Sequence, residues 1–255
     1  MDARDLLRGE LARRGAVYTV AGDGRWMVTV GSMRMLVSLD NLDRQLAGDA
    51  ADAERVAFFA DQLLAAAQMP PVTAVGLYWF AEPNDYLVAA EIRALVSRRV
   101  DRVLVHVSGD GGLIRWVTHA QLDAAGLTAA HAAERAWANL DQAVRQAQVT
   151  TLEIAGATVA MLATELPSKA SLLLAPALRE RIQDVIGWPV LAVAPDRDFV
   201  YLWNASRRDL ITGMGGVVTC EHARAPYPLS TEIFQIGDSL RAVGAYAAAT
   251  NPSSN

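Results

Sequence analysis

The sequence predicts an α+β fold, with antiparallel or mixed sheets built from hairpins and with helices packed on the faces of those sheets. Short apolar runs alternate with turns rich in Gly, Asp and Pro, which is typical of hairpins. Longer segments have apolar residues at three- and four-residue spacing, which is typical of helices with one buried face. The chain has 255 residues, of which 52% are hydrophobic and 20% are charged, so it can form a sizeable core.

The clearest helix is predicted over residues 128–147. Ala133, Trp137, Leu140 and Val144 recur there at helical spacing, so we expect this stripe, Trp137 included, to be buried. Other helices are predicted over residues 2–14, 41–46, 51–68, 85–98 and 176–186, and a glycine-containing helix is predicted to follow Ser206 and Asp209. Residues 170–174 fit either a strand or a helix.

Asn139 lies at the edge of the stripe in the helix predicted over residues 128–147. A buried amide without partners costs on the order of 1–3 kcal/mol. We therefore expect the Asn139 side chain to be hydrogen-bonded to backbone or to a helix cap.

Strands are predicted over residues 17–20, 26–30, 34–39, 72–80, 102–107, 113–117, 151–154 and 158–163. Residues 229–236 and 240–247 are predicted to form two further strands, or a strand and a short turn. The most apolar hairpin covers residues 187–203, where the strand at residues 190–194 is apolar on both faces. A strand that is apolar on both faces is buried on both. We therefore expect this hairpin at the centre of the main sheet, with helices on one side and a helix or loop on the other.

For the domain organisation, we expect a single domain over residues 1–248, with two lobes meeting near residues 147–151 as the alternative. Residues 249–255 are expected to be a disordered tail.

Composition and charge exclude several classes of protein. The formal net charge is −5 and there is no basic stripe, so we expect no nucleic-acid partner. Cys220 is the only cysteine, which excludes an intrachain disulfide and a multi-cysteine zinc site. The charged N-terminus has no apolar signal core, and no apolar run is long enough to cross a membrane. The sequence therefore predicts a soluble, cytoplasmic protein with no membrane partner.

Four segments occur in the order found in a known family: SLDNL at residues 38–42, AWANL at 136–140, ASLLL at 170–174 and VAPDRD at 193–198. Through them the chain resembles the YtpQ-like family of uncharacterised bacterial proteins, over roughly residues 5–245. The family is usually Ser-like where Asp196 stands, and residues 77–84 match no family segment. The resemblance implies a cytoplasmic α+β protein, and it brings no catalytic residue with it.

The polar turn of the apolar hairpin is the candidate binding site, formed by Asp196, Arg197 and Asp198. Arg197 could hold a carboxylate or a phosphate, or the two carboxylates could hold a divalent cation. Arg207, near the start of the following helix, is a further candidate. The alternative interpretation, which the sequence favours, is a solvated turn in which Arg197 pairs with a neighbouring residue.

No other motif predicts chemistry. Cys220 and His222 diverge at i, i+2 on a helix, so we expect a buried, inert cysteine rather than a nucleophile. The four histidines, His106, His119, His131 and His222, lack the spacing of a metal site. The glycine clusters at residues 109–112 and 213–216 lack the pattern of a phosphate loop. The sequence thus predicts no catalytic residue, no cofactor and no metal.

Two functions remain open from the sequence. The first is a non-catalytic binding or interaction protein whose partner is another bacterial protein; the sequence leaves its oligomeric state open. Its support is the acidic surface and the strands rich in aromatic residues, although such residues more often pack in a core. The alternative is a small-ligand-binding regulator, or an enzyme, that uses the polar turn at residues 195–198.

Overall fold

The computed structural model describes residues 2–22, 25–31, 33–39, 42, 46, 52–85, 92–109 and 113–247. The chain forms two compact units, Met1–Pro70 and Pro71–Asn255. The division therefore lies at Pro70–Pro71 and not near residues 147–151, where Val144, Ala147 and Leu162 share one core. The expected disordered tail lies outside the described residues.

Among its described residues, unit 1 contains a three-stranded antiparallel meander and the two helices α1 and α3. Its elements are α1 (Ala3–Arg13), β1 (Val17–Gly22), β2 (Arg25–Val30), β3 (Met33–Ser38) and α3 (Ala53–Ala67). Asp2 and Asp52 begin the helices as N-caps, because each side chain accepts a hydrogen bond from a backbone N–H of the first turn. Buried residues of both helices and of the strands form one core. Most of the predicted helix at residues 41–46 lies outside the described residues.

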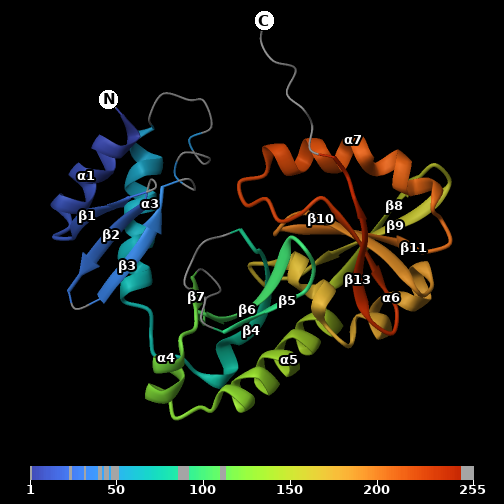
Figure 1. Cartoon of the computed structure of the whole chain (residues 1–255), viewed down its shortest axis with the longest axis horizontal. Helices are drawn as coiled ribbons and strands as arrows, with labels where there is room; N and C mark the ends of the chain where they lie inside the picture. The colour runs from blue at the N-terminus through green and yellow to red at the C-terminus, as the bar shows by residue number, and fades with distance from the viewer. Residues whose placement is uncertain are drawn as a thin grey trace, which may run out of the picture. The chain divides into compact units, whose positions relative to one another are not determined.

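The described part of unit 2 contains two antiparallel sheets (Figure 1). The four-stranded sheet consists of β4 (Leu77–Pro83), β5 (Arg93–Leu95), β6 (Val100–Val107) and β7 (Ile114–Trp116). The six-stranded sheet has the order β13-β12-β10-β11-β9-β8, with β8 (Gln148–Ile154), β9 (Ala157–Ala163), β10 (Val190–Asp196), β11 (Phe199–Asn204), β12 (Glu232–Ile236) and β13 (Leu240–Ala245). The helices are η1 (Ala74–Gly76), α4 (His119–Ala124), α5 (Ala129–Gln146), η2 (Lys169–Leu174), α6 (Leu178–Ile186) and α7 (Asp209–Arg224). The α+β prediction is therefore confirmed.

The apolar hairpin lies at the centre of the six-stranded sheet, as its two apolar faces predict. β10 pairs with β11 on one side and with β12 on the other. On one face Trp203 and Val193 pack in a core with Met214 of α7. On the other face Ala192 and Leu202 belong to the larger core, which includes residues of α5, α6 and η2.

The buried face of α5 differs from the predicted stripe by one position over its first half. Ala132 and Ala136, together with Leu140 and Val144, are buried, whereas Ala133 and Trp137 are only half-buried. Trp137 lies at the margin, with its ring centroid 5.8 Å from that of Trp79. An indole at the margin of a helix–sheet contact can cover the strand while its outer edge stays exposed.

Asn139 has the backbone partners that its position predicts. Its Nδ2 lies 3.0 Å, 3.1 Å and 2.8 Å from the carbonyl oxygens of Ala74, Val75 and Leu77, to which it donates. Replacing Asn139 with Ala should lower the free energy of unfolding by about 1–3 kcal/mol, because these carbonyls lose their donor. Asn139→Asp should be no milder, since a carboxylate cannot donate. Urea unfolding checks both variants, and unchanged midpoints would contradict this role.

The predicted helix at residues 85–98 is wrong where the structure describes it. Residues 93–95 form β5, which pairs with residues 101–103 of β6, and residues 86–91 lie outside the described part. The turn between the strands is closed by Ser97, whose Oγ accepts hydrogen bonds from the N–H groups of Arg99 and Val100. Sheet pairing and this local turn override the helical spacing of the apolar residues. The ambiguous segment at residues 170–174 belongs to the 3₁₀ helix η2.

Candidate functional site

The predicted polar turn is held in place by three backbone hydrogen bonds to two neighbouring segments. Arg197 N donates to Tyr227 O at 3.1 Å, and Ala170 N donates to Arg197 O at 2.9 Å. Leu229 N donates to Pro195 O at 3.0 Å. The β10–β11 turn is therefore packed between η2 and the segment that follows α7, and it does not project alone into solvent.

Arg197 forms an ion pair with a carboxylate from the other sheet of unit 2. Its Nη2 lies 3.4 Å from Oε2 of Glu82, at the end of β4, and the two side chains are 13% and 3% exposed. The guanidinium carbon of Arg197 also lies 5.1 Å from the ring centroid of Tyr227, which is a cation–π contact. Neither carboxylate oxygen of Glu82 has a hydrogen-bond partner in the described structure. The pair links the two sheets, and because it is buried it is not a solvated surface ion pair.

The two aspartates of the turn lie in different environments. Asp196 is buried, and its Oδ1 accepts a hydrogen bond of 2.7 Å from the backbone N–H of Asp198. This bond closes the turn locally, as Asp commonly does. Asp198 is exposed, and its Oδ1 lies 3.9 Å from Nζ of Lys169. The solvated interpretation thus holds for Asp198 and not for Asp196.

Burial perturbs the acidity of three groups near the turn. It raises the pKa of Glu82, although the positive charge of Arg197 acts in the opposite direction. It also raises the pKa of Asp196, and it lowers the pKa of His222, which Arg99 lowers further. Such groups could exchange protons with a ligand. However, Glu82 and Asp196 are only 2% and 3% exposed, so a substrate cannot reach either carboxyl in this conformation.

Arg207 lies beyond the opposite end of β11 from the turn. Its guanidinium donates to the carbonyl oxygens of Ala155 and Gly156 in the β8–β9 turn, at 3.0 Å each. It also forms a two-point contact with Asp209, at 2.9 and 2.6 Å. The structure therefore brings Asp196, Arg197 and Asp198 together and places Arg207 at a separate junction.

Cys220 is exposed on α7, so the expectation of a buried cysteine is wrong. The expectation fails because α7 carries small and apolar residues on its outer face as well as on its inner one. His106 is buried in β6, with Nε2 3.3 Å from Oγ1 of Thr73. Most of the strand aromatics pack in the cores: Trp26, Trp79, Tyr201 and Trp203 are buried, and Tyr78, Trp116 and Trp188 are half-buried.

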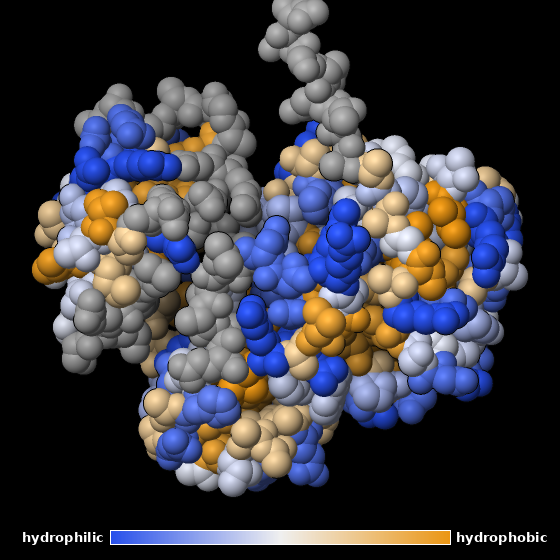
Figure 2. Space-filling view, in the orientation of Figure 1, coloured by the Kyte–Doolittle hydropathy of each residue, from blue (hydrophilic) through white to orange (hydrophobic). Residues whose placement is uncertain are grey.

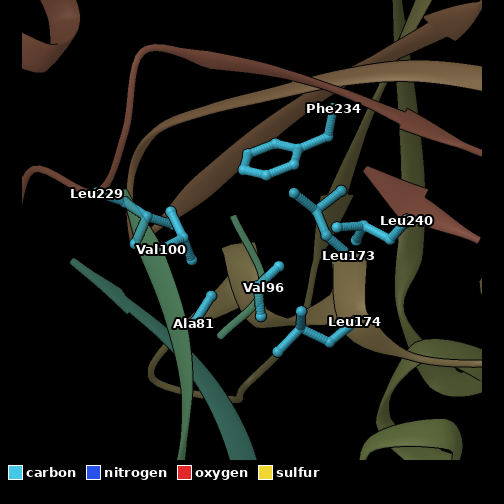
Figure 3. Close-up of a pocket in the computed structure, with 8 residues that line it drawn as sticks. All are labelled: Ala81, Val96, Val100, Leu173, Leu174, Leu229, Phe234 and Leu240. Carbon is cyan, nitrogen blue, oxygen red and sulfur yellow. The ribbon is translucent and has the colours of Figure 1, made fainter. Parts of the chain in front are cut away.

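A second feature of unit 2 is an apolar hollow, which the sequence did not predict. It is lined by Ala81, Val96, Val100, Leu173, Leu174, Leu229, Phe234 and Leu240, whose side chains face one another across it in Figure 3. Its enclosed space is small, with room for about one water molecule, so the hollow is a shallow depression in the surface. Figure 2 shows an apolar area with hydrophilic neighbours in the part of the unit that Figure 1 labels β5 and β13. The described residues that line the hollow are all apolar, so they can contact an apolar group and can do no acid–base chemistry.

The hollow was missed because its lining comes from five separate parts of the chain. Ala81 lies in β4, Val96 and Val100 flank the β5–β6 turn, and Leu173 and Leu174 end η2. Leu229 precedes β12, while Phe234 and Leu240 lie in β12 and β13. Glu82 was missed for a similar reason. A single acid at the end of an apolar strand is the only local signal, and its partner is 115 positions away along the chain.

Within the described ranges, no three His, Cys, Asp or Glu side chains are grouped to hold a metal ion. None of the helices in the same ranges is long and apolar enough to span a membrane. Comparison of the chain with protein-family models, with curated proteins and with solved structures finds no match.

Proposed function

We propose that the protein is a non-catalytic interaction protein, and that the apolar hollow of unit 2 receives an apolar side chain of another protein. The observation that supports this proposal is the hollow itself. Apolar surface left in water costs about 25 cal/mol per Å², so a concave apolar surface favours a bound partner. Leu95, which precedes the lining residue Val96 in the chain, is a further apolar residue that is 71% exposed.

The polar turn supports the alternative function less well. A regulator or enzyme acting there would need Glu82 or Asp196 to become accessible, and both are buried and bonded into the junction between the sheets. The shifted pKa values of the groups in this cluster are explained by a structural ion pair at least as well as by a catalytic role. The cytoplasmic location and the kinship with the YtpQ-like family belong to the same proposal and rest on the sequence alone.

The test is a selection from a displayed random-peptide library, followed by measurement of the dissociation constant of an enriched peptide. Leu240→Asp places a charge at the hollow and should weaken binding by more than tenfold, because a buried unpaired charge opposes docking. Val217→Asp is the matched control, since Val217 is an exposed apolar residue of α7 away from the hollow. Equal affinity of the native chain and Leu240→Asp, or a selection that enriches no peptide, would overturn the proposal.

A further inference from the structure

We infer that the partner segment binds in an extended conformation as an additional strand on β13, with an apolar anchor residue in the hollow and acidic residues beside it. This inference rests on the proposed function and adds the conformation and the chemical class of the partner. It follows from three features of unit 2: an open sheet edge, the position of the hollow beside that edge, and the charge around the hollow.

The open edge is β13. It is the last strand of the six-stranded sheet and pairs only with β12 among the described residues. Residues 241–245 are exposed, and Arg241 is the only charged residue among them. The outer edge of a terminal strand presents N–H and C=O groups that can pair with another chain. A segment that adds to such an edge gains main-chain hydrogen bonds, and pockets beside the edge select its side chains.

The hollow lies on one face of this edge. Leu240 lines it, and the register places Leu240 opposite Ile236 and Ala242 opposite Phe234, another lining residue. Leu240 and Ala242 therefore share the face of the sheet on which the hollow opens. In a strand added outside β13, alternate side chains would point to that face, and one of them would lie over the hollow. Its next neighbours would point to the other face.

A β-bulge limits how far the added strand can extend. The register of β13 shifts between Ile233 and Phe234, which leaves Val243 as the extra residue. Bulges interrupt the regular ladder and twist an edge away from further pairing. Pairing is therefore confined to the start of β13, next to the hollow. A short stretch of pairing implies that the anchor residue and the charges supply most of the affinity, as in a transient complex.

The charge around the hollow predicts acidic residues in the partner. Arg98 and Arg99 lie between the lining residues Val96 and Val100, and both are exposed. Arg241 points to the opposite face of the sheet from Leu240, where its Nη2 donates to Oε1 of Gln235 at 2.9 Å. Among the acids of the same segments, Glu232 is buried and accepts a hydrogen bond of 2.5 Å from Oγ of Ser97, Asp101 is buried and 3.6 Å from Arg93, and Asp238 is exposed. The chain as a whole carries a net charge of −5, so this cationic border is local. Opposite charge across the rim steers association and selects the partner.

The test uses the enriched peptide, synthesised with one backbone amide N-methylated at a time. N-methylation removes a donor and blocks strand pairing, so alternate positions near the anchor should weaken binding more than tenfold while the intervening ones change it little. Arg98→Glu, in the exposed β5–β6 turn, should weaken binding at least fivefold, and the effect should shrink at high salt. Arg135→Glu, on the exposed face of α5, is the charge-reversal control and should leave the affinity unchanged.

The outcomes separate this inference from the proposed function. If Leu240→Asp abolishes binding but no N-methylation affects it, the hollow is the binding site and the added strand is wrong. An enriched consensus with apolar residues at three- and four-residue spacing would also overturn the added strand, because it indicates a bound helix. If Leu240→Asp binds as tightly as the native chain, the proposed function itself fails.

Discussion

Replacing Arg197 with Met should lower the free energy of unfolding by about 3–5 kcal/mol at pH 8, the usual cost of breaking a buried ion pair from one side. The variant leaves the carboxylate of Glu82, which is 3% exposed, without its counter-charge. It also removes the cation–π contact with Tyr227. Denaturant unfolding at a fixed temperature measures the loss.

The loss should depend on pH in a defined direction. The pKa of Glu82 is already raised by burial, and Arg197 opposes that rise. Without Arg197 the pKa of Glu82 rises further, so the folded variant binds a proton more tightly than the unfolded chain. The contribution of Glu82 to the stability of the variant is then largest at low pH and is lost as pH rises through the folded pKa of Glu82. The deficit of Arg197→Met relative to the native chain should therefore be larger at pH 8 than at pH 5.

The matched control is the double variant Glu82→Gln with Arg197→Met. Glutamine cannot ionise, so adding Arg197→Met to the Glu82→Gln background should cost at least 2 kcal/mol less than it does in the native background. The pH dependence of that cost should also be lost. If the effects of the two substitutions on the free energy of unfolding are additive, the pair behaves as a surface ion pair. The same holds if Arg197→Met costs less than about 1 kcal/mol at pH 8.

Trp203→Ala should lower the free energy of unfolding by about 3–5 kcal/mol, because it leaves a cavity between β11 and α7. Trp203 is fully buried, and the core around it includes Leu191, Leu210 and Met214. Trp137→Ala removes the same number of atoms from a half-buried position and should cost less than half as much. Thermal or denaturant unfolding of both variants checks the contrast. Equal losses would show that burial does not decide the cost at these positions.

The sequence predicts those parts of the fold that depend on local signals. Thr128 and Asp2 are polar caps followed by periodic apolar residues, and each begins a helix in the structure. The hairpin at residues 190–203 is predicted by its two apolar faces, since only a central strand buries both. In each case the residues that determine the element lie within the element itself.

What the sequence could not predict depends on partners far along the chain. The apolar residues near Leu95 have helical spacing, and only the presence of β6 alongside them makes them a strand. Arg197 appears solvated until Glu82, in a different sheet, is placed beside it. The hollow requires both sheets and η2 at once. Long-range pairing of this kind leaves no periodic pattern in the sequence.

The interaction proposal is tested most directly by backbone hydrogen exchange of the protein with and without an enriched peptide. A peptide seated in the hollow and paired with the sheet edge should slow exchange in β13 and in the β5–β6 turn, residues 96–99. Exchange at the polar turn, residues 196–198, should stay the same, because its backbone is already bonded to neighbouring segments. Protection confined to the polar turn, with β13 unaffected, would contradict the proposal and assign binding to the turn instead.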